Sequence, residues 1–160
     1  MTTITGLTML VSPRSSDEWL EARRLVETYA TSLRIDLSFQ DFTRELESLS
    51  SYYGPPDGCF LMATRHGAAI GCGALRRFSA SACEMKRLYV IPDCRGEHVG
   101  RTIVAVLIER ARALGYESML LDTLPTMKDA QALYASFGFS QTPQYRFNPV
   151  AGATYWKLDI

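Results

Sequence analysis

The chain has 160 residues, 47% of them hydrophobic, and it balances 17 lysines and arginines against 17 aspartates and glutamates, so its formal net charge is zero. This length fits a single domain over residues 1–160 that buries a core of its own. Balanced charge without a basic stripe argues against nucleic-acid binding, and no apolar run approaches the ~18 residues of a membrane span.

The N-terminal segment and the cysteines bear on the compartment of the protein. No lysine or arginine precedes the short apolar patch at the N-terminus, which argues against a signal peptide. Three of the cysteines lie in or beside predicted strands, which favours buried free thiols in a reducing cytoplasm over a structural disulfide. Without a CxxC pair, and with only two histidines, the sequence matches no familiar zinc spacing and we expect no metal site. The cysteines are Cys59, Cys72, Cys83 and Cys94.

The first part of the chain predicts a short strand at residues 8–11 and two helices. Ser15 and Glu18 have the Ser-x-x-Glu spacing of a capping box, and apolar residues recur at helical spacing after them. Residues 38–41 predict the start of a second, shorter helix. Residues 52–58 are rich in glycine and proline, which predicts a loop.

The middle of the chain predicts a hairpin and then a central strand. Residues 59–64 and 68–75 are two apolar runs joined by a turn at residues 66–67. Residues 84–91 are crowded with apolar and aromatic side chains, as a buried central strand requires. Pro92 ends this strand because it has no N–H to donate.

A basic, glycine-bearing turn over residues 95–100 leads into a helix whose apolar residues recur at helical spacing up to Gly115. A strand, such a turn and a helix N-terminus direct unpaired backbone N–H groups and the positive end of a helix dipole to one point. The natural ligand there is a phosphate or pyrophosphate. The alternative is an ordinary connection between strand and helix.

The last third predicts a short buried strand at residues 119–123 and a helix that is capped at Thr126 and ends at Gly138. Two further strands are expected, one starting at residue 139 and one over residues 153–158. Strands that alternate with helices predict a mixed sheet with helices on both of its faces.

Two motifs occur in a fixed order in the second half of the chain. The first is RGEHVG at residues 95–100, and the second is AQALY at residues 130–134 followed by FGF at residues 137–139. They are similar to the patterns R/Q-x-x-G-x-G/A and A-x-x-L-Y…G-F of the GNAT superfamily of acetyl-CoA-dependent N-acyltransferases. The resemblance covers most of the chain from Cys59 onward and is strongest over residues 84–139.

The resemblance implies a single α/β (α+β) domain with a mixed, mostly antiparallel central sheet flanked by about four helices. It also implies acetyl-CoA as cosubstrate. Backbone N–H groups of the turn are expected to wrap the pyrophosphate, and the backbone of the central strand is expected to bind the pantetheine arm as if it were an added strand. The residues implied are Leu88, Tyr89, Val90, Arg95, Gly96, Glu97, His98, Val99, Gly100 and Arg101, with Arg95 or Arg101 as candidates for the 3′-phosphate.

Two positions depart from the family pattern. His98 stands where the family has its middle glycine, so its backbone either tolerates the geometry or is strained if φ is positive. Cofactor affinity would then suffer, unless the imidazole supplies a donor near the phosphates. Met127 stands where the family often has asparagine, seven residues before Tyr134, so the contribution of that asparagine is absent or replaced.

Tyr134 is the first candidate for the chemistry. Helical spacing alone favours a place in the core for an aromatic residue. The resemblance instead implies that the Tyr134 hydroxyl protonates the leaving thiolate, which is feasible because the pKa of tyrosine lies slightly above that of a thiol. A covalent cysteine route is not favoured, because no cysteine is paired with a histidine.

Glu84 is the second candidate. The resemblance to histone acetyltransferases implies a general base that takes the proton of the attacking amine, with a water chain as the alternative base. The competing interpretation is a cross-strand pair with Arg76 or Arg77. On a regular strand Glu84 would share a face with Lys86 and Leu88, whereas a bulge, common in this strand of the family, would change that pattern.

Several further residues are candidates for contacts with the acceptor. Asp122 and Thr123 end a strand at an edge that lines ligand clefts in α/β sheets, with helix capping or turn formation as the alternative. His66 is interpreted as a turn residue, and His98 is too far along the cofactor to act as a base. By resemblance, a late loop and the early helical region contribute Tyr145, Arg146, Asn148, Tyr52, Tyr53 and Phe39.

The predicted function is transfer of an acetyl group from acetyl-CoA to a primary amine, preferably of a small molecule, by direct attack in a ternary complex. The alternatives are an acyl-CoA-binding sensor without turnover, and an acetyltransferase that acts on protein N-termini or lysines. We expect a cytoplasmic protein without a nucleic-acid or membrane partner. A homodimer is expected by resemblance alone.

Overall fold

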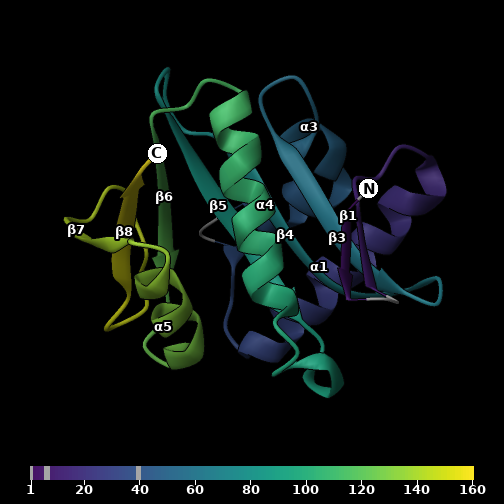
Figure 1. The fold of residues 1–160 in the computed structure, drawn as a ribbon. Helices are drawn as coiled ribbons and strands as arrows, with labels where there is room; N and C mark the ends of the chain where they lie inside the picture. Colours follow the sequence, from purple (N-terminus) through teal and green to yellow (C-terminus); the bar gives the residue numbers. More distant parts are fainter. Residues whose placement is uncertain (1, 6–7, 39–40) are drawn as a thin grey trace.

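The computed structural model describes residues 2–5, 8–38 and 41–160. The chain has an α/β fold with one eight-stranded sheet in the order β1-β2-β3-β4-β5-β6-β8-β7 (Figure 1). The strands are β1 (Thr2–Thr5), β2 (Thr8–Val11), β3 (Cys59–Arg65), β4 (Ala68–Arg77), β5 (Ala82–Val90), β6 (Ser118–Thr123), β7 (Ser140–Thr142) and β8 (Thr154–Asp159).

Helices cover both faces of the sheet, as expected. The helix labelled α4 in Figure 1 crosses β4 and β5 on one face, and α1 and α3 pack on the other. The described residues contain one α-helix more than the approximate four expected. The helices are α1 (Ser16–Leu33), α2 (Phe42–Glu47), α3 (Leu49–Tyr53), α4 (Val99–Ala113) and α5 (Lys128–Ser136), with a short 3₁₀ helix, η2 (Pro92–Cys94).

The sheet divides the apolar core into two clusters. One cluster forms around α4, where Ile103 and Leu107 are fully buried, and the other forms around α1 and α3, where Val26 and Tyr53 are fully buried. The close approach of α4 requires Gly73, because a Cβ there would lie 2.6 Å from a methyl carbon of Ile103. Burial on both faces explains why the central strands are almost continuously apolar.

The sheet is mostly antiparallel, and β5 and β6 are the parallel neighbours within it. These two strands pair only from Ala82 to Glu84 on β5, opposite Ser118 to Leu120 on β6. Beyond Glu84 the strands diverge (Figure 1). The second half of β5 therefore has a strand neighbour in β4 but none in β6, and the sheet has an open edge in its interior.

A β-bulge at Arg87 changes which side chains of β5 share a face. Lys86 lies opposite Ala74 and Tyr89 lies opposite Cys72, so two residues of β5 oppose one residue of β4 between them. Arg87 has a φ of 61°. The alternation expected of a regular strand is therefore wrong after Lys86, and Leu88 packs on the α4 side of the sheet.

A buried ion pair joins this bulge to α2. Arg87 donates from Nε to one oxygen of Glu45 at 2.7 Å and from Nη2 to the other at 2.8 Å. Both side chains are at most 3% exposed, and the guanidinium also lies 5.2 Å from the ring centroid of Phe42. The bidentate geometry satisfies two charges that would otherwise be costly to bury.

Several local signals in the sequence are confirmed. Ser15 is the N-cap of α1, and its hydroxyl accepts a hydrogen bond from the backbone of the first helical turn. β3 and β4 join through a turn at His66 and Gly67, and Gly115 and Gly138 follow α4 and α5 with positive φ. The four cysteines are buried and free.

The early helical region differs from the sequence prediction. α2 and α3 are separate helices, because Ser48 has φ −140° and ψ 41° and leaves the helical conformation. Tyr52 and Tyr53 belong to α3 rather than to the loop predicted for residues 52–58. Tyr53 is completely buried, and this burial stabilises the helical conformation although the glycine and proline residues that follow predict a loop. The predicted helix start includes Phe39 and Gln40, which lie outside the described residues.

The C-terminal third also differs in two places. Thr126 does not cap α5, which starts at Lys128 after Met127 and has no side-chain cap. The strand predicted from residue 139 is the three-residue β7. Pro143 follows β7 directly and has no N–H to continue the pairing with β8.

The ion pair between Glu45 and Arg87 predicts a large stability effect. Glu45→Gln leaves the Arg87 guanidinium buried without its counter-charge, so we expect the free energy of unfolding to fall by ~3 kcal/mol. Urea denaturation measures this change. The matched control is Glu27→Gln, which breaks an exposed pair with Arg23 and should cost less than ~1 kcal/mol. Equal losses in the two variants would contradict the importance assigned to the buried pair.

Candidate functional site

The turn between η2 and α4 has the geometry of an anion site. Gly96 has a φ of 84° and His98, the N-cap of α4, has a φ of 63°, and the His98 side chain does not cap the helix. The first helical hydrogen bond runs from the Thr102 N–H to the His98 carbonyl. Helix geometry therefore leaves the N–H groups of Val99, Gly100 and Arg101 without an intrahelical acceptor. These groups and the helix dipole favour a bound phosphate.

The strain anticipated for His98 is present in the backbone. Its left-handed conformation costs a residue with a Cβ ~1–2 kcal/mol relative to glycine. At Gly96, by contrast, a Cβ would meet no atom within 4 Å, so the positive φ and not the available space explains the glycine. Gly100 lies close to Val90 and Leu133, at the start of α4.

Charged side chains surround the turn and are bound by the protein itself. Arg95 donates from Nε to the Val90 carbonyl at 2.9 Å, and its guanidinium lies 5.7 Å from the ring centroid of Tyr89. Glu97 pairs with Arg65 at 2.7 Å. Arg101 donates to the Ser136 hydroxyl at 2.9 Å and stacks on Phe137, which joins α4 to α5. These residues therefore lie around one turn, and their contact with a cosubstrate stays a prediction.

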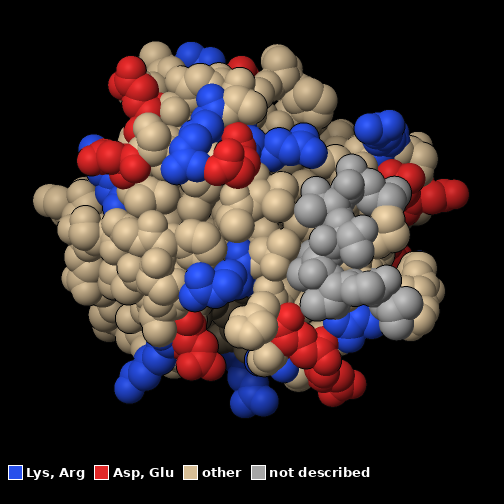
Figure 2. All heavy atoms as spheres, viewed as in Figure 1, with Lys and Arg blue, Asp and Glu red and all other residues tan. Residues whose placement is uncertain are grey.

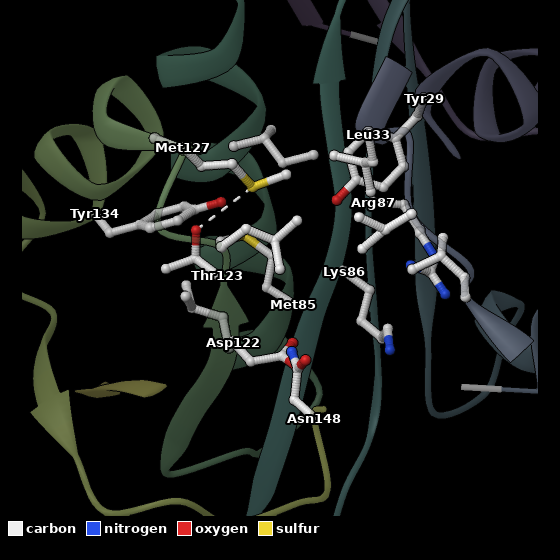
Figure 3. Close-up of a pocket in the computed structure, with 16 residues that line it drawn as sticks. Tyr29, Leu33, Met85, Lys86, Arg87, Asp122, Thr123, Met127, Tyr134 and Asn148 are labelled. Carbon is white, nitrogen blue, oxygen red and sulfur yellow. Dashed lines mark hydrogen bonds between the residues drawn. The ribbon is translucent and has the colours of Figure 1, made fainter. Parts of the chain in front are cut away.

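A pocket lies where β5 and β6 diverge, and it reaches α1 and α5 (Figure 3). Its volume of about 60 Å³ is enough for several atoms beyond a water molecule. Of the predicted strand residues, Leu88 lines it, and Tyr89 and Val90 follow on the same open stretch of β5. The lining residues are Tyr29, Leu33, Ile35, Leu37, Met85, Lys86, Arg87, Leu88, Leu121, Asp122, Thr123, Leu124, Met127, Ala130, Tyr134 and Asn148.

Tyr134 reaches this pocket from α5. The side chain is 7% exposed, its ring packs 5.8 Å from that of Phe139, and its hydroxyl points into the pocket (Figure 3). Burial raises the pKa of Tyr134 well above its ordinary value, so the hydroxyl is protonated at neutral pH and is a weaker acid than an unperturbed tyrosine. The arrangement combines the two sequence interpretations, because the ring is part of the core and the hydroxyl lines the site.

Glu84 is fully buried next to the pocket and makes three contacts. It accepts from Arg76 at 3.2 Å, from the Tyr145 hydroxyl at 2.7 Å and from Arg146 at 2.8 Å. Burial raises its pKa, but the charges of Lys86 and Arg146, the Tyr145 hydrogen bond and the charge of Arg76 outweigh burial and leave the pKa lowered. The cross-strand partner that the sequence offered as an alternative, Arg76, is present.

Polar groups at the end of β6 form the opposite side of the pocket. Asp122 accepts a hydrogen bond from the Asn148 side-chain amide at 3.1 Å. The Thr123 hydroxyl donates to the sulfur of Met127 at 3.5 Å, so the methionine at the family's asparagine position is part of the pocket wall (Figure 3). Asp122 and Thr123 therefore line the candidate site, as the sequence predicted from their place at a strand end.

The remaining acceptor candidates divide into two groups. Tyr145 and Arg146 contact Glu84, so the late loop is attached to the sheet beside the pocket. Tyr53 is fully buried against Phe60, and Tyr52 lies under the guanidinium of Arg76. The tyrosines of α3 are thus not among the residues that line the pocket. Phe39 lies outside the described residues.

Sequence reasoning did not identify Lys86 and Tyr29 as site residues. Lys86 is 6% exposed and lines the pocket from β5, and Tyr29 reaches it from α1 (Figure 3). Burial, with the charge of Arg87, lowers the pKa of Lys86 to about 7. A lysine inside a strand as apolar as β5 was a usable signal, because lysine is almost never fully buried without a reason.

The surface charge and the helices bear on the general class of the protein. On the face seen in Figure 2, acidic and basic side chains are interspersed. No helix in the described ranges is long and apolar enough to cross a membrane. Residues 8–38 and 41–160 also contain no group of three or more histidine, cysteine or acidic side chains with the arrangement of a metal site.

Lys86 predicts a pH dependence of stability. The folded state releases the Lys86 proton near pH 7, whereas the unfolded state keeps it to about pH 10.5, so the unfolded state binds more protons between these values. The Lys86 contribution to the free energy of unfolding should therefore rise above pH 7, and the interval from pH 7 to 8 lies below the thiol pKa of about 8.5 and the phenol pKa of about 10. Urea denaturation at several pH values measures the slope.

Lys86→Met should remove this rise, because the variant has no group that titrates there. Lys157→Met is the matched control, since Lys157 is on β8 and is well exposed beside Asp159. The control should keep the wild-type slope. Identical slopes in wild type and Lys86→Met would contradict the lowered pKa.

Comparison with known proteins agrees with this geometry. A family model described as "Acetyltransferase (GNAT) family" matches residues 19–139. An uncharacterised N-acetyltransferase of Schizosaccharomyces pombe is 41% identical over 92% of this chain and 90% of its own length. The N-acetylaspartate synthetase of Danio rerio is 27% identical over 82% of this chain and 48% of its own.

The fold has close counterparts among solved structures. A crystal structure of an acetyltransferase from Streptococcus agalactiae superposes with a TM-score of 0.81, at 21% identity, over 97% of this chain and 99% of the other. At that identity the likeness concerns the fold, and the family assignment depends on the sequence matches. The chain belongs to the GNAT family and is an N-acetyltransferase, with the acetyl-CoA cosubstrate that is typical of this family.

Proposed function

We propose that the protein transfers the acetyl group of acetyl-CoA to a primary amine of a small molecule by direct attack in a ternary complex. The observation that supports the proposal is that three structural features lie next to one another. The turn at Gly96–Gly100 follows β5 in the chain, the second half of β5 has no pairing with β6, and the pocket with Tyr134 lies where these two strands diverge. Together they fit a ligand that has a pyrophosphate at one end and a thioester at the other.

In this proposal the cosubstrate lies along β5 from the turn to the pocket. The N–H groups at the start of α4 bind the pyrophosphate, and Arg95 and Arg101 are close to that end. The backbone of Leu88, Tyr89 and Val90 supplies the hydrogen-bonding edge for the pantetheine arm, since β6 has diverged from it. Such positioning raises the effective concentration of the thioester next to the amine.

The chemical step exchanges a C–S bond for an N–C bond. The amine nitrogen attacks the thioester carbon, the new N–C bond forms, and the C–S bond breaks. The departing sulfur accepts the proton of the Tyr134 hydroxyl, and tyrosine regains a proton from solvent. Backbone N–H groups of β5 near Leu88–Val90 stabilise the negative charge on the carbonyl oxygen during the attack.

The base that accepts the amine proton is either Glu84 or a water chain. A lowered pKa makes a carboxylate a weaker base, and the three partners of Glu84 occupy both of its oxygens. This geometry favours water as the base and a positioning role for Glu84, which fastens Tyr145 and Arg146 beside the pocket. Glu84→Gln would then mainly affect acceptor KM.

The acceptor is proposed to be small because the pocket has a volume of only about 60 Å³ and is lined by residues of α1 and α5. The printed name of the Danio rerio relative, N-acetylaspartate synthetase, denotes a small acetylated product and supports this choice. A protein acceptor would need a groove for a polypeptide segment, and a sensor would not need a tyrosine hydroxyl in the pocket.

The first prediction concerns acetyl-CoA binding. Acetyl-CoA should raise the melting temperature by mass action, and Gly96→Ala should give a smaller rise at the same concentration, because a Cβ disfavours the φ of 84°. Gly115→Ala is the matched control, since Gly115 has a φ of 88° and equally open space at the other end of α4. It should lose similar stability, about 1 kcal/mol, yet keep the full shift. The absence of any shift with wild type at millimolar acetyl-CoA would overturn the proposal.

The second prediction concerns turnover. Tyr134→Phe should lower kcat by roughly 10²–10⁴ because the acid for the thiolate is lost, while the Kd for acetyl-CoA stays near that of wild type. Thiol release measures kcat. Tyr116→Phe is the control, because the Tyr116 hydroxyl donates to the Asp57 carbonyl away from the pocket and should not affect kcat. Acetyl-CoA binding without turnover on any amine in the wild type would favour the sensor.

A further inference from the structure

The wall of the pocket that β5 forms is electropositive. Lys86 and Arg87 line it directly, and Arg76 and Arg146 stand behind it around Glu84. The acidic side chains on this side are Glu84 and Glu45, and the bidentate contact with Arg87 uses the charge of Glu45. Among the described residues of this wall, four basic side chains thus stand with two acidic ones, so positive charge exceeds negative charge beside the pocket.

The facing wall, formed by β6 and α5, has the opposite character. Asp122 is the acidic residue among those that line the pocket, and Thr123 and Tyr134 are its polar neighbours there. The Asp122 carboxylate accepts a hydrogen bond from Asn148, and a carboxylate has the capacity to accept further hydrogen bonds from a ligand. Figure 3 places Asp122 and Lys86 on either side of the lower part of the pocket, with Tyr134 on the side of Asp122.

We propose that the acceptor carries a carboxylate close to its amine, as an amino acid does, with Lys86 binding the carboxylate and Asp122 binding the amine. This inference rests on the proposed function, whose acceptor it specifies. The polarity of the walls sets the orientation of the acceptor. The amine lies on the side of Tyr134, where the thioester is attacked, and the carboxylate lies on the side of β5.

Lys86 lies in a wall that carries more positive than negative charge. An ammonium group is costly to bury, and the neighbouring charge of Arg87 adds to the cost. Burial accordingly lowers the pKa of Lys86, although Glu84 acts in the other direction. An acceptor carboxylate would place a negative charge beside Lys86 and Arg87, in a wall that carries more positive than negative charge, and a neutral acceptor would not. Discrimination by charge therefore follows from the pocket itself.

The test compares acceptors that differ only in the carboxylate. Glycine, β-alanine, L-methionine and L-phenylalanine are each measured against the corresponding carboxamide, with acetyl-CoA fixed and thiol release as the readout. Amidation lowers the amine pKa and enlarges the nucleophilic fraction, so the chemistry alone favours the amides. We expect at least one acid to exceed its amide in kcat/KM by roughly tenfold or more, the effect of one charge-assisted hydrogen bond.

The variant Lys86→Met connects this preference to the pocket. Methionine has a similar length without the charge, so kcat/KM for the acid should fall by roughly tenfold while that for the amide changes little. The melting-temperature shift with acetyl-CoA reports whether the variant is folded and binds its cosubstrate. Lys157→Met, which removes an exposed lysine on β8, should keep the wild-type preference.

The outcomes separate the two proposals. Equal kcat/KM values for acids and amides in the wild type would overturn the inference and leave acetyl transfer to amines intact. A preference for acids that survives in Lys86→Met would overturn the assignment to Lys86. Thiol release with none of these compounds, but with amines that have no acid group, would also overturn the inference. Failure to release thiol with every amine would overturn the proposed function and the inference with it.

Discussion

The bidentate ion pair between Arg87 and Glu45 is the constraint on which the site depends. It accompanies a bulge in β5, and the bulge directs Leu88 toward the α4 side of the sheet, next to Met85's cluster. It also joins α2 to Arg87, a residue that lines the pocket. Two charges buried to this extent are compatible with a stable fold only when each satisfies the other. The same contact therefore shapes the strand and positions the wall.

The divergence of β5 and β6 is the second constraint, and it has a chemical consequence. Two parallel strands that separate after Glu84 leave backbone groups of β5 without a strand partner, and such groups favour a ligand that can act as a strand. The divergence also creates the pocket, whose walls carry charges of opposite sign because they come from different strands. The binding mode proposed for the cosubstrate and the polarity proposed for the acceptor thus have one structural origin.

Glu84 illustrates how far local sequence reasoning reaches. The sequence left two roles open for Glu84, a general base or a partner in a cross-strand ion pair. The structure shows the ion pair with Arg76. Glu84 also contacts Tyr145 and Arg146, which come from a loop about 60 residues away. The loop contacts could not be anticipated, because their residues are remote in sequence and give no periodic signal. A lysine within the apolar β5 was itself a signal, but the pocket that Lys86 lines exists only once α1 and α5 pack beside the diverging strands.

The sequence by itself determined the elements that short-range chemistry specifies. Ser15 caps a helix, Pro92 ends β5, and the glycine-bearing turn before α4 is encoded by residues that adopt positive φ. The two family motifs, each local, were sufficient for the fold and the reaction class. Only the tertiary structure decided where β5 and β6 diverge, that the bulge falls at Arg87, and which charges face the pocket. These features depend on contacts between segments that are distant in the chain, and a local sequence pattern does not contain the energies of such contacts.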